Sequence, residues 1–254
     1  MKTWMKWAIA AVVVVILGVV GGPFVYINFI KDDPPDRFEL DADAASTDTS
    51  AAGASTPTAA PGVTTATTEA APVTRAPATG AAAATWTIDP ATSSVGYRVV
   101  EVLFGQDTEG VGRTSAITGG LTLDGTQVST AQFDVDMTTV TSDESRRDDQ
   151  FRGRIMDTDN FPTATFVLTT PIDLGTVPAD GVAVTATATG DLTLKGTTNS
   201  VTFDVQAQQS GDTMQIVGST DIVFADYGID DPSTSGISTQ DHGLLEFDLH
   251  LVPG

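Results

Sequence analysis

Residues 86–254 of this 254-residue chain predict an all-β fold, an eight-stranded antiparallel barrel with one short helix. Hydrophobic residues alternate with polar or small residues in about eight successive runs, the pattern of half-buried strands. Most connections between the runs are too short to join parallel strands, so antiparallel pairing is expected. Eight long strands leave two sheet edges, and closing the sheet into a barrel removes both.

Turn residues separate the alternating runs. One run ends at the turn pair Asp124-Gly125, and another ends at Lys195-Gly196. The runs cover residues 86–88, 95–99, 117–123, 133–137, 164–168, 182–194, 201–205, 214–224 and 245–251.

Residues 142–157 break the alternation and predict the short helix. Ser142 is a suitable N-cap because its hydroxyl can accept a hydrogen bond from the first turn. Asp148 precedes Arg152 by four residues, a favourable order for an ion pair on a helix. The helix is therefore expected to begin at Ser142 and to end near Gly153 or just beyond it.

Residues 1–31 predict a single transmembrane helix that precedes the barrel. Residues 8–30 carry no charge, and about 20 apolar residues suffice to span a bilayer. Lys2 and Lys6 precede this stretch, so the N-terminus is expected in the cytoplasm and the barrel domain outside it. The alternative is a cleaved signal peptide whose apolar core ends at residues 21–23.

Residues 32–85 read as a disordered linker. The segment consists mainly of Ala, Thr, Ser, Pro and Gly, without a periodic apolar face, and so cannot bury a core. The same composition also suits an O-glycosylated stalk. The expected organisation is therefore anchor 1–31, linker 32–85 and barrel domain 86–254.

Composition excludes several function classes. With 12 Lys and Arg against 33 Asp and Glu, the formal net charge is −21, which argues against binding of nucleic acid. The chain has no Cys and only two His, His242 and His250, so Cys-type and three-His metal sites are impossible. No EF-hand spacing, phosphate loop or nucleophile elbow occurs. We therefore expect no enzyme activity, no catalytic residue, no cofactor and no metal site.

The interior of an eight-stranded barrel is either filled by side chains or holds one small ligand. Small residues between the apolar ones, such as Ala186 and Ala188 in a run that alternates with Thr, would leave room for a slot. Alternation alone selects the inward face, so a register error of one residue would turn a strand's set outward. The residues predicted to line the slot and bind the ligand are Tyr97, Val99, Leu121, Phe133, Val135, Phe166, Leu192, Leu194 and Phe203.

Four arginines within nine positions form the main basic cluster: Arg146, Arg147, Arg152 and Arg154. Arginine binds phosphate or carboxylate groups through two parallel hydrogen bonds, so Arg147 and Arg152 are candidate ligands for an anionic head group. The alternative is a helix whose arginines pair with the neighbouring acidic residues.

Four segments resemble the YceI-like family, the lipocalin-like polyisoprenoid-binding domains of bacteria. They are WTIDPATSSVGYRV, DMTTVTSDESRRDDQFRGRIMDTDNFPTATF, GDLTLKGTTNSVTFDV and ADYGID, in this order along residues 86–252. Arg147-Asp148 and Phe161-Pro162 with Phe166 fall on the most specific positions. The resemblance implies a lipocalin-like barrel outside the cytoplasmic membrane, with an isoprenoid or similar amphiphile in its interior.

Two departures from the family pattern concern the ligand's head group. Thr92 stands where family members often have His, and Phe224-Ala225 where a basic residue is common. Both remove polar groups that could face a diphosphate.

The sequence therefore predicts a membrane-tethered, extracytoplasmic binding protein that carries or scavenges an isoprenoid or other apolar lipid. The alternative is a structural or adaptor domain of the cell envelope with a filled barrel, whose acidic surface meets a basic partner. No particular protein partner is indicated.

Overall fold

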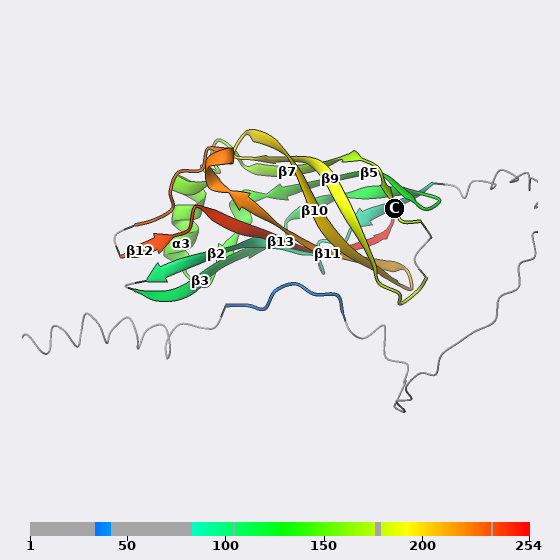
Figure 1. The fold of residues 1–254 in the computed structure, drawn as a ribbon, viewed down its shortest axis with the longest axis horizontal. Helices are drawn as coiled ribbons and strands as arrows, with labels where there is room; N and C mark the ends of the chain where they lie inside the picture. Colours follow the sequence, from blue (N-terminus) through cyan, green and yellow to red (C-terminus); the bar gives the residue numbers. More distant parts are fainter. Residues whose placement is uncertain (1–33, 42–82, 104, 176–178, 235) are drawn as a thin grey trace, which may run out of the picture.

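The computed structural model describes residues 34–41, 83–103, 105–175, 179–234 and 236–254 (Figure 1). In these parts of the chain, no helix has the length and apolar character needed to cross a bilayer. The predicted span at residues 8–30 lies outside the described residues, as does most of the predicted linker.

Eight strands close into an antiparallel barrel, as predicted. β1 (Ala84–Ile88) pairs with β4 (Ile117–Asp124) on one side and with β13 (His242–Pro253) on the other. Five strands complete the ring between β4 and β13, each antiparallel to its neighbours: β5 (Gln127–Asp136), β7 (Thr163–Thr170), β9 (Val184–Leu194), β10 (Thr197–Ser210) and β11 (Thr213–Val223).

Further strands extend the wall at one end of the barrel. β2 (Ser94–Leu103) pairs with the first half of β13 and with β3 (Gln106–Thr114). β3 in turn pairs with the short β6 (Thr141–Ser142), and β12 (Ile237–Thr239) pairs with the end of β2. The remaining short strand, β8 (Ile172–Asp173), pairs with β5.

The helix α3 (Ser145–Gln150) lies at the same end as β12 (Figure 1). It continues as one π-helical segment, η5 (Phe151–Ile155), and so ends just beyond Gly153 as expected. Two short 3₁₀ turns, η4 (Met137–Thr139) and η6 (Phe224–Tyr227), follow β5 and β11.

The predicted N-cap and ion pair of this helix are wrong. Glu144, not Ser142, occupies the N-cap position, without a side-chain cap. Ser142 lies in β6, where its hydroxyl and its backbone N–H both donate to the buried Asp148 carboxylate, at 2.6 and 2.8 Å. Because Asp148 is already engaged, Arg152 pairs with Asp149 instead, at 2.9 Å.

The core consists of two hydrophobic clusters. The strand cluster comprises Trp86, Val95, Ile117, Leu121, Val128, Ala131, Met214, Phe247, Leu249 and Leu251. The helix-end cluster comprises Val140, Phe151, Met156, Ala164, Leu192, Leu194, Ile222, Tyr227 and Ile229.

The boundary between linker and domain differs from the prediction at two places. β1 begins at Ala84, two residues inside the predicted linker. Residues 34–41, which we call the strap, have no regular secondary structure but hydrogen-bond to the outside of the barrel. The strap therefore makes contacts that the composition of the predicted disordered linker at residues 32–85 did not indicate.

Candidate ligand cavity

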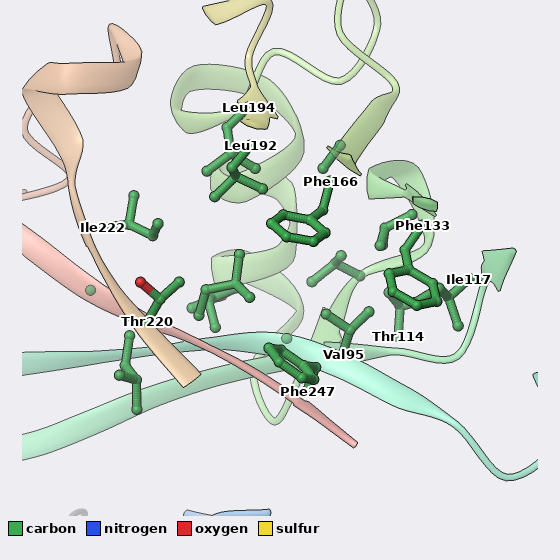
Figure 2. Close-up of a pocket in the computed structure, with 18 of the residues that line it drawn as sticks. Val95, Thr114, Ile117, Phe133, Phe166, Leu192, Leu194, Thr220, Ile222 and Phe247 are labelled. Atoms are coloured by element: carbon green, nitrogen blue, oxygen red, sulfur yellow. The ribbon is translucent and has the colours of Figure 1, made fainter. Parts of the chain in front are cut away.

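The barrel encloses a cavity of about 520 Å³. Its wall consists of inward side chains from the strands, together with residues of α3 and η5. Figure 2 shows side chains that face this space from several strands, among them Phe133 from β5, Phe166 from β7, Leu192 from β9 and Phe247 from β13. The wall is predominantly apolar, so the cavity suits an apolar guest.

All nine strand residues that the sequence predicts as lining do face the cavity: Tyr97, Val99, Leu121, Phe133, Val135, Phe166, Leu192, Leu194 and Phe203. Arg147 also lines it, whereas Arg152 does not. Their part in ligand binding stays a prediction.

The small residues of β9 also face inward. Ala186 and Ala188 line the cavity, while the alternating threonines do not. Thr187, for example, donates from its hydroxyl to the Asp204 carboxylate on the exposed outer face, at 2.7 Å. An alanine side chain leaves space that a larger residue would fill, so this strand contributes to the cavity volume.

The prediction omitted lining residues on β11 and β13, for which the sequence did contain a signal. They are Met214, Ile216, Thr220, Ile222, Leu245, Phe247 and Leu249. All of them are alternating residues of the runs 214–224 and 245–251, so the same argument would have found them.

Three phenylalanines form a continuous aromatic group in the cavity wall. Phe203 lies 5.5 Å from Phe166 and 5.8 Å from Phe247 between ring centroids. Glycines make room for two of these rings, because a Cβ at Gly190 would lie 2.5 Å from Phe166 Cζ, and one at Gly218 would lie 2.5 Å from Phe247 Cζ. An isolated glycine inside a strand is a sequence signal for such a close approach.

One end of the cavity is polar, and we call it the mouth. It is formed by α3, by Glu101 and Leu103 at the end of β2, and by Pro232, Thr234, Ile237 and Thr239. Among the described lining residues only Arg146 and Thr234 are exposed, and both lie at the mouth. The exposed lining residues therefore lie at the same end at which the charged groups of the cavity gather.

Arg147 is held at the mouth by two carboxylates. Its guanidinium lies 3.4 Å from Glu101 and also pairs with Asp143. Burial lowers the pKa of Arg147, but Glu101 and Asp143 outweigh that effect, so its pKa lies above the ordinary value. A Cβ at Gly110 of β3 would lie 2.9 Å from Arg147 Nε, so the missing side chain gives the guanidinium its place.

The other arginines of the cluster have different roles. Arg146 is exposed and lines the mouth. Arg154 donates to the backbone oxygens of Asp231 and Pro232, at 2.8 and 2.6 Å, and so holds the segment opposite the helix. Arg152 pairs with Asp149, so two of the four arginines, Arg147 and Arg152, form salt bridges, and anion binding by these two residues stays a prediction.

Tyr97 lies between the mouth and the apolar wall. Its ring stacks on Phe151 with centroids 5.0 Å apart and an angle of 11° between the planes. A Cβ at Gly112 of β3 would lie 2.4 Å from the Tyr97 ring, so glycine is needed there. Burial raises the pKa of the Tyr97 phenol, against a smaller lowering by Arg147, so the phenol stays neutral at physiological pH.

Acidic clusters do not form a metal site in the described part of the chain. No group of three or more His, Asp or Glu side chains there could hold a metal ion. The cavity offers mainly apolar contacts, a few uncharged polar groups that include the Tyr97 hydroxyl, and a charged rim.

The comparisons agree with this architecture. The model of the YceI-like domain matches residues 86–251, well over half of the chain. The chain belongs to the YceI-like family. No curated protein matches the chain.

Two solved structures resemble this YceI-like barrel. One is a polyisoprenoid binding domain from Saccharophagus degradans implicated in plant cell wall breakdown, with 17% identity, a TM-score of 0.56, and 66% of this chain and 98% of that chain covered. The other is BcnA from Burkholderia cenocepacia, with 26% identity, a TM-score of 0.51, and 64% and 98% covered. Each of these two structures aligns with this chain over nearly its own full length.

Proposed function

We propose that this YceI-like protein binds one isoprenoid or similar apolar lipid inside its barrel, as a carrier or scavenger tethered to the outer face of the cytoplasmic membrane. The observation that supports it is the apolar cavity of about 520 Å³ with a polar mouth. Pockets for small-molecule ligands have volumes of roughly 300–1,000 Å³. A filled barrel that acts only as a structural domain would not retain such a space.

Burial of the ligand's hydrocarbon supplies enough free energy for binding. Each buried methylene contributes ~0.8 kcal/mol, so roughly fifteen of them supply ~12 kcal/mol. Loss of translational and rotational freedom costs several kcal/mol. The remaining ~8 kcal/mol corresponds to a micromolar dissociation constant, without any contact to the head group.

The mouth favours a neutral head group over a diphosphate. The carboxylates of Glu101, Asp143 and Glu144 accompany Arg146 and Arg147 there, so the local charge is slightly negative. A diphosphate would be repelled by these carboxylates and would have to displace one of them from Arg147. A hydroxyl or a quinone carbonyl can instead hydrogen-bond to the Tyr97 phenol or to a rim side chain.

Membrane tethering is supported by the sequence. Residues 8–30 are uncharged and long enough to span a bilayer, and Lys2 and Lys6 precede them. The similar structure from Saccharophagus degradans is a polyisoprenoid binding domain, which supports a polyisoprenoid ligand for this chain. Membership of the YceI-like family supports ligand binding in preference to catalysis.

Uptake of a polyprenol by a soluble chain that begins at Pro34 tests the lipid-binding proposal. Native mass spectrometry should detect one polyprenol per chain. Ala186→Leu fills the cavity and should lower the affinity at least tenfold, about 1.4 kcal/mol. Thr185→Leu is the matched control, because Thr185 is exposed on the other face of the same strand.

The filled-barrel alternative predicts the opposite result. In a filled core, Ala186→Leu would overpack the interior and cost about 1–3 kcal/mol of stability. A wild-type chain that takes up no polyprenol or quinone, together with a melting temperature lowered by several degrees in Ala186→Leu, would refute the proposal.

A further inference from the structure

We infer that the strap fixes the orientation of the barrel on the membrane, with the cavity mouth turned toward the bilayer. This inference rests on the proposed function, both for the anchor at residues 8–30 and for the lipid in the cavity. It assigns a specific role to residues 34–41, which composition alone placed in a linker.

The strap is bound to the barrel mainly through its backbone. Arg98 Nη2 donates to the carbonyl oxygen of Pro35 at 2.6 Å, and Arg113 donates to the carbonyl oxygen of Asp36. At the other end of the strap, the Gln215 side chain forms two hydrogen bonds. Its Oε1 accepts from the Asp41 N–H at 2.9 Å, and its Nε2 donates to the backbone carbonyl oxygen of Glu39 at 3.4 Å. These contacts fix both ends of the strap on the outer wall.

The wall beneath the strap carries an ionic network that is buried, although it lies outside the barrel. Glu246 is 2% exposed and Arg98 is 5% exposed. Glu246 pairs with Arg113 at 2.7 Å and with Arg98 at 3.5 Å, and Arg98 also pairs with Glu109 at 2.6 Å. The Arg113 guanidinium lies 4.0 Å from the centroid of the Phe38 ring of the strap. The strap thus adds hydrogen-bond acceptors and an aromatic face to this network of charged side chains.

The strap runs away from the mouth. Its first residues, Pro34 and Pro35, line one small surface pocket together with Ser142 and Asp143, which lie just before the N-cap of α3. Its last residue, Asp41, contacts Gln215, whose partner on β13 is His250, toward the opposite end of the barrel. Figure 1 shows the strap in blue alongside β2 and β3. The chain that leads to the strap therefore arrives from the side of the mouth.

The connection from the uncharged stretch to the strap is short. Only residues 31–33 separate Ile30 from Pro34. Four Cα steps span at most about 14 Å at ~3.6 Å each, so a membrane-spanning segment at residues 8–30 keeps Pro34 close to the bilayer. If the strap were not docked, the residues from 32 to 85 would form a flexible tether with an r.m.s. span of roughly 40 Å, which imposes no orientation.

Energy transfer from two labelled positions to the bilayer tests this orientation. The chain has no Cys, so single cysteines can be labelled selectively in the full-length protein. Ser145→Cys places a donor on α3 at the mouth, and Asp212→Cys places one on the turn between β10 and β11 at the opposite end. The protein is reconstituted into phosphatidylcholine vesicles that contain a lipid with an acceptor on its head group.

We expect more efficient transfer from position 145 than from position 212. Replacing residues 34–41 by a Gly-Ser segment of equal length should abolish the difference, and the same replacement at residues 52–59 is the matched control. Equal or inverted efficiencies in the wild-type chain would overturn the inference, as would a difference that survives replacement of the strap.

The outcomes for the orientation and for the proposed function can be separated. If the full-length protein is removed from vesicles by alkaline washing, the anchor and the orientation both fail, but lipid binding is unaffected. If the soluble chain from Pro34 takes up no polyprenol while position 145 still lies nearer the bilayer, the lipid-binding proposal fails and the orientation stands.

Discussion

The strand cluster and the helix-end cluster of the core differ in the secondary structure of their members. Every member of the strand cluster lies on a β-strand, from Trp86 on β1 to Leu251 on β13. The helix-end cluster takes Val140, Phe151, Met156, Tyr227 and Ile229 from turns, the π-helical segment and connecting segments.

This difference bears on how rigidly the two parts of the barrel are held. Strand residues are held on both sides by the hydrogen bonds of the sheet, so the strand cluster forms a fixed wall. Residues of the helix end depend on individual side-chain bonds, such as those from Ser142 to Asp148 and from Arg154 to the backbone of Asp231. Among the described residues, the charged and the exposed lining residues of the cavity occur only at this second end.

The largest expected effect is that of Leu251→Ala in the strand cluster. Leu251 is fully buried, and the closed wall has little freedom to collapse around the lost atoms. We expect a loss of about 2–5 kcal/mol in the free energy of unfolding, measured by urea denaturation. Val252→Ala is the control, since its side chain is only partly buried. A loss below about 1 kcal/mol would contradict the view of this cluster as a rigid wall.

Phe151→Ala at the helix end should cost less, although the side chain is larger. Phe151 faces the cavity and stacks on Tyr97, so fewer close contacts are lost than in a filled core. We expect about 1–3 kcal/mol, below the usual cost of removing a core phenylalanine, and faster release of a bound polyprenol. Stopped-flow displacement of a fluorescent polyprenol measures the release. An unchanged rate would show that Phe151 does not limit release of the lipid.

Asp148→Asn tests the bonds that position α3. The amide retains one acceptor but loses the charge that strengthens the bonds from Ser142, so we expect a loss of about 1–2 kcal/mol by thermal or urea denaturation. Asp149→Asn is the matched control. Asp149 is highly exposed and pairs only with Arg152 in the described structure, so its loss should be at most about 0.5 kcal/mol. Equal effects of the two substitutions would count against a positioning role of Asp148.

The smallest effect concerns Tyr97 and pH. Because burial raises the pKa of its phenol above the ordinary value of about 10, the folded state binds this proton more tightly than the unfolded state. The contribution of Tyr97 to stability is then fully present below about pH 10 and declines as the pH rises further. Tyr97→Phe should therefore flatten the fall in melting temperature above pH 10. A parallel fall in both proteins would contradict the burial of this phenol.

Most of the fold was accessible from the sequence, because alternation reports directly on a half-buried strand. It was sufficient for the eight-stranded ring and for the nine predicted wall residues of the cavity. The alternation argument failed where the two-residue period of buried side chains is interrupted. Val128 and Ala131 are both buried, although they stand three residues apart, because the register between β4 and β5 shifts after Thr122.

The helix end and the strap were harder to predict for a physical reason. Whether Ser142 caps a helix or bonds to Asp148 depends on which segments meet in three dimensions. Either arrangement gives the Ser142 hydroxyl a hydrogen-bond partner, so the sequence does not distinguish them. The strap has no periodicity, since it binds through backbone oxygens rather than an apolar face. Its contacts become apparent only when the sheet places Arg98 of β2, Arg113 of β3 and Gln215 of β11 on one outer wall.

The position of β1 has a consequence for how the protein reaches its final state. This five-residue strand closes the barrel, because Trp86 pairs with Leu121 of β4 on one side and with Pro253 of β13 on the other. Trp86 and Pro253 lie near opposite ends of the domain sequence. Contacts between residues so distant along the chain slow the folding of β proteins, because loop-closure entropy is lost before the contact forms. The barrel cannot close until residues 251–253 of β13 are available, so closure must follow synthesis of this strand. Until β1 has paired with both neighbours, β4 and the end of β13 each present an unpaired edge, and this interval is when the domain is most exposed to aggregation.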